Sequence, residues 1–120
     1  MFKIKETEIG DIIVEREVIE TIAGLAAIDC YGLVGMVAQD FQSGLWSILG
    51  LDSIRKGVSV RSSDQGLIVD VHVIVGYGIK IHEVAHNVMQ KVAYVLEHNA
   101  GITIAQVNVN VKGVKVLGDN

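Results

Sequence analysis

Valine and isoleucine dominate this chain, since 19 Val and 15 Ile together make up 34 of its 120 residues. Both side chains branch at Cβ, which restricts their rotamers in a helix and suits them to the pleated surface of a sheet. The chain has no Pro and a single cysteine, Cys30, so Pro-rich linkers and an intramolecular disulfide framework are excluded. At this length a hydrophobic core forms without disulfides. We therefore expect a single domain over residues 1–120 that is rich in strands.

Apolar and polar residues alternate over three segments in the second half of the chain. Residues 58–62 and 67–75 flank the turn-forming sequence Ser-Asp-Gln-Gly at 63–66, which is typical of a β-hairpin. Residues 102–111 form the third alternating segment and follow Gly101. In these strands we expect the valines to face the core. The polar residues expected on the opposite, solvent-facing side are Asp70, His72, Asn108 and Asn110.

Two other segments have the three- and four-residue apolar spacing of amphipathic helices. The first helix is expected from about Glu15 to Gly32 and the second from about Lys80 to Asn99. Residues 8–14 and 33–38 predict two further short strands. The expected order is therefore β-α-β-β-β-α-β. This order predicts an α+β fold, a two-layer sandwich in which two amphipathic helices cover one face of a mixed sheet.

Large apolar side chains gather between residues 39 and 56, where two glycines interrupt any helical pattern. Three interpretations of this segment remain open. It plugs the edge of the core, it presents a docking surface to a protein or a membrane, or it forms the lid of a pocket for a small apolar ligand. The residues that we expect to bind a partner are Phe41, Leu45, Trp46 and Leu49.

The sequence His82-Glu83-Val84-Ala85-His86 matches the H-E-x-x-H motif of zinc proteases. Two histidines four residues apart share one face of a helix and can hold Zn²⁺, while the glutamate can act as a base toward bound water. Met89 and Val92 stand where the extended motif requires Gly and His, so a third ligand is missing. We therefore expect His82 and His86 to be helix-surface residues, and a zinc hydrolase remains the alternative. The sequence predicts no cofactor and no enzymatic activity.

The charge balance argues against nucleic acid as a partner. Ten basic residues stand against 14 acidic ones, for a net charge of −4, so the chain lacks the basic field that drives nucleic-acid binding. Residues 21–39 are strongly apolar, but Asp29 at their centre opposes a membrane span. The N-terminal residues do not resemble a secretory signal. We therefore expect a cytoplasmic protein with at most peripheral membrane contact.

Nine short motifs follow one another along the chain between Ile9 and Val114. They are Gly10-Asp11-Ile12-Ile13, Glu17-Val18-Ile19-Glu20-Thr21-Ile22-Ala23, Gly32-Leu33-Val34-Gly35-Met36, Lys56-Gly57-Val58-Ser59-Val60, Tyr77-Gly78, Glu83-Val84-Ala85, Asn87-Val88, Val107-Asn108-Val109-Asn110-Val111 and Gly113-Val114. In order and spacing they resemble the alkaline shock protein family of Gram-positive bacteria, also called the Gls-type general stress family. The resemblance implies a small cytoplasmic protein without known catalysis that is linked to envelope stress and homeostasis. Some members sit at the membrane through an anchored partner protein, and short ones can be encoded beside a kinase-like protein acting on fatty acids.

The leading hypothesis is a non-enzymatic interaction or scaffold protein of cell-envelope stress and homeostasis. It would dock to a membrane-linked or lipid-metabolism partner and form homo-oligomers. The last strand, rich in valine, would pair with another strand if it lies at a sheet edge. The alternatives are the zinc hydrolase and the carrier of a small apolar ligand.

Overall fold

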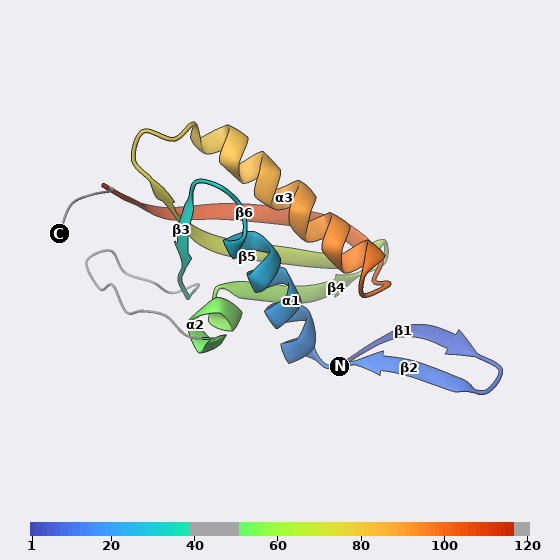
Figure 1. The fold of residues 1–120 in the computed structure, drawn as a ribbon. Coiled ribbons are helices and arrows are strands. Elements are labelled where there is room, and N and C mark those ends of the chain that lie inside the picture. Colours follow the sequence, from blue (N-terminus) through green and yellow to red (C-terminus); the bar gives the residue numbers. More distant parts are fainter. Residues whose placement is uncertain (39–50, 117–120) are drawn as a thin grey trace.

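The computed structural model describes residues 1–38 and 51–116, which form strands and helices in the order β-β-α-β-α-β-β-α-β (Figure 1). The strands are β1 (Phe2–Thr7), β2 (Gly10–Val14), β3 (Leu33–Met36), β4 (Val58–Ser63), β5 (Gly66–Gly76) and β6 (Ile104–Lys115). The helices are α1 (Arg16–Ile28), α2 (Leu51–Lys56) and α3 (Ile81–His98). The expected α+β class is confirmed.

Strand β5 is the centre of the main sheet. On one side it pairs with β6 in parallel along nearly its whole length. On its other side β4 pairs antiparallel with the first half of β5, and β3 pairs antiparallel with residues 73–75. Strands β3 and β4 therefore lie end to end along the same side of β5. The resulting sheet is mixed, as the sequence predicts.

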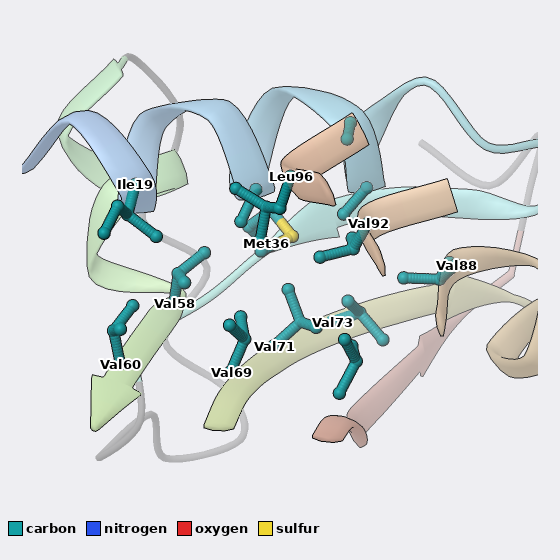
Figure 2. Packing of buried hydrophobic residues seen from close by; sticks show 14 of the residues in the cluster. Ile19, Met36, Val58, Val60, Val69, Val71, Val73, Val88, Val92 and Leu96 are labelled. Atoms are coloured by element: carbon teal, nitrogen blue, oxygen red, sulfur yellow. The ribbon is translucent and has the colours of Figure 1, made fainter. Parts of the chain in front are cut away.

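The hydrophobic core lies between this sheet and helices α1 and α3 (Figure 2). The valines of β5 at odd-numbered positions point toward the helices, as the alternation predicts. Helix α3 buries one residue per turn against them. The side chains that fill the space between the layers include Ile19, Met36, Val58, Val60, Val69, Val71, Val73, Val88, Val92 and Leu96.

Two elements differ from the sequence prediction. Residues 2–7 form β1, which pairs with β2 in a hairpin that projects from the body of the fold. The expected strand at residues 8–14 is therefore partly wrong, because Glu8 and Ile9 form the turn and Gly10 follows with a φ of 150°. The second difference is α2, a short helix that packs against α1 in a region where no helix was expected.

Cys30 follows α1 and packs against the core in the manner of a small apolar residue. Its Sγ atom lies 3.7 Å from the Ala26 carbonyl oxygen. Burial raises the pKa of the Cys30 thiol, which opposes formation of the reactive thiolate. The structure thus supports a structural interpretation of this residue.

Candidate interaction surface

One long edge of the main sheet is formed by β6. Among the described residues, β5 is the strand that pairs with β6, and its other side carries no paired strand. A strand in this position presents a row of backbone N–H and C=O groups to which another strand can bind. The expectation that the valine-rich last strand lies at a sheet edge is therefore confirmed.

The hydrogen bonds of β5 show which backbone groups of β6 face outward. The N–H of His72 donates to Gly57 and its C=O accepts from Val37, so this residue bonds toward β4 and β3. Since backbone groups alternate along a strand, Val71 and Val73 turn theirs toward β6. Val71 lies opposite Val109, and in a parallel pair it bonds to the residues on either side of its partner. The outward-facing groups of β6 consequently belong to Val107, Val109 and Val111.

The stretch Gln-Val-Asn-Val-Asn-Val at residues 106–111 forms the regular part of this edge. The register with β5 shifts on either side of it, at Ala105 and at Lys112, which are the extra residues of two bulges. Between these bulges the strand has no charged residue and no Pro. Charges, prolines and bulges are the usual devices that protect an edge from pairing. Residues 106–111, which we call the β6 edge, are therefore chemically competent to bind a further strand.

The face of the sheet opposite the helices carries a small polar network. The Asn108 side-chain amide donates a hydrogen bond of 2.7 Å to the Asp70 carboxylate, which joins β6 to β5. The Arg61 guanidinium lies 3.5 Å from the other oxygen of the same carboxylate. Asp70 is 17 % exposed and Arg61 62 % exposed. This network aligns the two strands and fills the polar side of the sheet.

His72 is buried on this same face, and the expectation that it faces solvent is wrong. Its side chain is 5 % exposed, beside Ile74 at 1 % and Val37 at 7 %. Within the described part of the chain, neither ring nitrogen has a hydrogen-bond partner. Desolvation lowers the pKa of His72, Lys112 lowers it further and Asp70 opposes the shift. Alternation in the sequence predicts the face of the sheet on which a side chain lies, but it does not reveal how far neighbouring groups cover that side chain.

The two histidines of the H-E-x-x-H motif lie on the surface of α3, where both are exposed together with Glu83. In residues 1–38 and 51–116 there is no group of three or more His, Cys, Asp or Glu side chains arranged to hold a metal. Tyr94 and His98, further along α3, stack with their ring centroids 4.1 Å apart. The geometry of His82 and His86 is that of helix-surface residues.

The residues expected to bind a partner, Phe41, Leu45, Trp46 and Leu49, lie outside the described residues. Their role stays a prediction. A pocket of about 340 Å³ lies elsewhere, between the N-terminal hairpin, the turn that joins β4 to β5 and the residues just before β6. Lys3, Ser62, Ser63 and Thr103 are among its lining residues, so its wall is more polar than a site for an apolar ligand requires.

A family model described as the alkaline shock protein (Asp) 23 family, with a cell envelope-related function, matches residues 4–116. The chain belongs to this family. The match begins within β1 and extends past the end of β6, so the main sheet and its edge fall within the matched residues. The resemblance drawn from the short motifs is thereby confirmed.

Relatives of this alkaline shock protein family member include the uncharacterized protein YloU of Bacillus subtilis. It is 43 % identical over 111 residues, which are 92 % of each chain. A stress response regulator gls24 homolog of Streptococcus pyogenes is 24 % identical over 106 residues, or 88 % of this chain and 59 % of that protein. The family therefore includes proteins described as stress regulators.

Solved structures with a similar fold include a copper form of the MamM CTD. It has a TM-score of 0.56 and 16 % sequence identity, and the match covers 87 % of this chain and 90 % of that one. A variant of the same MamM CTD gives a TM-score of 0.58 at 14 % identity, covering 84 % and 100 % of the two chains. At these identities the likeness concerns the fold alone. In the described ranges of the alkaline shock protein chain, none of the helices has the length and apolar character needed to cross a membrane.

Proposed function

We propose that this chain is a non-enzymatic scaffold of the cell envelope that binds other proteins by adding their strands to its sheet. The observation that carries this proposal is the β6 edge, whose outward-facing backbone groups at Val107, Val109 and Val111 have no paired strand among the described residues. Main-chain hydrogen bonds at a sheet edge supply affinity, and the side chains on the two faces supply selectivity. The cell envelope-related description of the family supports the cellular setting.

The chemistry of the edge favours a protein strand as its occupant. On the helix side, an added strand meets the valines of β6, and on the other side it meets the amides of Asn108 and Asn110. An added strand with alternating aliphatic and polar residues satisfies both faces. The expected setting is the cytoplasm, with a partner that is itself linked to the membrane or to lipid metabolism.

The segment with Phe41, Leu45, Trp46 and Leu49 is proposed as a second contact with the same partner. Apolar side chains that lie exposed in a cluster mark interaction sites, and the composition of this segment motivates the proposal. Capture of the partner by Trp46→Ala and Leu49→Ser variants tests this contact. Unchanged capture by both folded variants would count against it.

The sharpest test of the scaffold function removes one backbone N–H from the β6 edge. In Val109→Pro the lost N–H faces outward, so the ladder to β5 is preserved while the ring blocks an added strand. Val109→Ala is the matched control, because it removes side-chain carbons and keeps the N–H. Partners would be captured with the tagged chain from the cells that produce it, identified by mass spectrometry and tested again as purified proteins.

We expect the wild type and Val109→Ala to bind the purified partner with similar affinity, and Val109→Pro to bind it at least tenfold more weakly. Circular dichroism and thermal unfolding check that the variants are folded. If a folded Val109→Pro variant binds the partner as the wild type does, the edge is not the binding surface.

The described residues offer no observation that favours the zinc hydrolase or the carrier of an apolar ligand.

A further inference from the structure

We propose that one occupant of the β6 edge is the β6 edge of a second copy of this chain, paired antiparallel about a two-fold axis at Val109. This inference rests on the proposed function, since it uses the same edge. The outward-facing backbone groups belong to Val107, Val109 and Val111, and the bulges at Ala105 and Lys112 lie just beyond them. The free groups are thus centred on Val109.

The position of the bulges selects this register. With the axis at Val109, Val107 of each copy lies opposite Val111 of the other, and Val109 lies opposite itself, so all three outward-facing residues of each strand are bonded. If the axis moves to Val107 or to Val111, the paired stretch runs into a bulge, at Ala105 or at Lys112. If it moves by one residue, one outward-facing valine of each copy loses its partner within the regular stretch. The register at Val109 therefore forms the most hydrogen bonds.

The side chains are complementary in the same register. Valine meets valine on the face that the helices cover, and the Asn108 amide meets the Asn110 amide on the polar face. Lys112 faces the uncharged Gln106, so like charges are not brought together. An edge that matches itself in both backbone and side chains favours a second copy as its occupant.

Pairing of this kind also closes the exposed edge. A two-fold interface uses the same surface of both copies and stops at two. The sheet then continues from β4 and β3 of one copy through both β6 strands to β3 and β4 of the other. While the copies are paired, neither presents the stretch at 106–111, so a partner strand and a second copy compete for the same edge.

Sedimentation of the purified chain over a series of concentrations tests the dimer. We expect the wild type and Val109→Ala to form a dimer, and Val109→Pro to sediment as a monomer at the same concentrations with an unchanged circular dichroism spectrum. A wild type that remains monomeric throughout overturns the proposal. A dimer that persists in Val109→Pro overturns it as well, because the copies then meet through another surface.

Cysteine pairing tests the register. In a Cys30→Ser background, Asn108→Cys and Asn110→Cys chains are mixed and oxidised. These positions face each other as a non-hydrogen-bonded pair, with Cα atoms about 4.5 Å apart, which suits a disulfide. We expect the mixture to cross-link at least tenfold faster than either variant alone, and equal rates would refute the register.

If the chain is monomeric while partner binding still depends on the N–H of Val109, this inference fails and the proposed function stands.

Discussion

Gly24 in α1 lies directly against Ile54 in α2, so that a Cβ atom at Gly24 would overlap the Cγ2 methyl of Ile54. The same atom would also approach the Ile54 carbonyl oxygen to 3.0 Å. Small neighbours on α1, Ala23 and Ala27, are completely buried. Because Gly24 has no side chain, the backbones of α1 and α2 can approach each other closely at this point.

We predict that Gly24→Ala destabilises the protein although alanine favours helices. In a helix interior this substitution normally gains about 1 kcal/mol. Here overpacking against the backbone of Ile54 costs about 1–3 kcal/mol, so we expect a net loss of stability of about 1 kcal/mol. Urea unfolding measures the difference. Gly35→Ala is the control, because nothing lies within 4 Å of the added Cβ, and its stability should change by less than about 0.5 kcal/mol.

The buried imidazole of His72 predicts a loss of stability on acidification. Its pKa in the folded protein is lowered from 6.5 by desolvation and by Lys112, with Asp70 opposing. Below pH 6.5 the unfolded chain therefore binds more protons at this residue than the folded one, and the free energy of unfolding falls as the pH falls. His72→Leu should remove this part of the pH dependence. It should also stabilise the protein at pH 7 by about 1–2 kcal/mol, because two buried unpaired nitrogens disappear.

Unfolding of wild type and His72→Leu in urea at several pH values between 7 and 5 measures this effect. His86→Gln is a suitable control, since His86 is exposed on α3. Identical pH profiles for the wild type and His72→Leu would contradict the prediction. If the pH dependence of the free energy of unfolding becomes as weak in His86→Gln as in His72→Leu, the effect does not depend on the burial of His72.

The Asp70 carboxylate is expected to contribute more to stability than its exposed ionic partner. Asp70→Ala leaves the Asn108 amide without its acceptor at 2.7 Å on a partly buried face, which costs about 1–3 kcal/mol. Arg61→Ala removes a largely exposed ion pair, which contributes no more than about 1 kcal/mol. Thermal unfolding at low and at high salt separates the two, because screening weakens the Arg61 pair alone. A larger loss in Arg61→Ala than in Asp70→Ala would refute this ranking.

Arg16 is expected to hold the N-terminal hairpin against the body of the protein. Its guanidinium lies over the Phe2 ring, 5.2 Å from the centroid, and donates a hydrogen bond to the Val60 carbonyl of β4. In Arg16→Ala we expect amide hydrogens of β1 and β2 to exchange about tenfold faster, while those of β5 keep their protection. Arg16→Lys keeps the charge without the planar group and should show an intermediate effect. Unchanged exchange in β1 and β2 would show that other contacts hold the hairpin.

Much of the fold was predictable because the alternation of valine is local information. Strands β4 and β5 and helix α3 end within one or two residues of their predicted limits, since Val69 and Val84 follow their periods closely. Strand β1 also has a signal, the alternation Phe2-Lys3-Ile4-Lys5, that the prediction did not use. Helix α2 has a much weaker one, because six residues form a stable helix mainly through tertiary packing.

The candidate site depended on information that local patterns do not hold. The valines of β6 predict a strand, but its place at the edge follows from the pairing of β5 with three other strands. His72 has the same alternating pattern as Asp70 and is nevertheless buried, because alternation does not show how closely neighbouring groups cover a position. The H-E-x-x-H motif at 82–86 shows the converse, because a local match carries no information about a third ligand in the folded chain.

The two backbone hydrogen bonds of His72 also have a consequence for the length of one connection in the chain. They connect His72 to Val37 and to Gly57, so the chain leaves the sheet after Val37 and returns to it at Gly57, beside the same residue of β5. The ends of the connection between them are fixed by the sheet whatever its length. Doubling such a connection costs only about 0.6 kcal/mol in closure entropy. A change in the length of this connection is therefore expected to leave the α1–α3 layer and the β5–β6 pair in their arrangement.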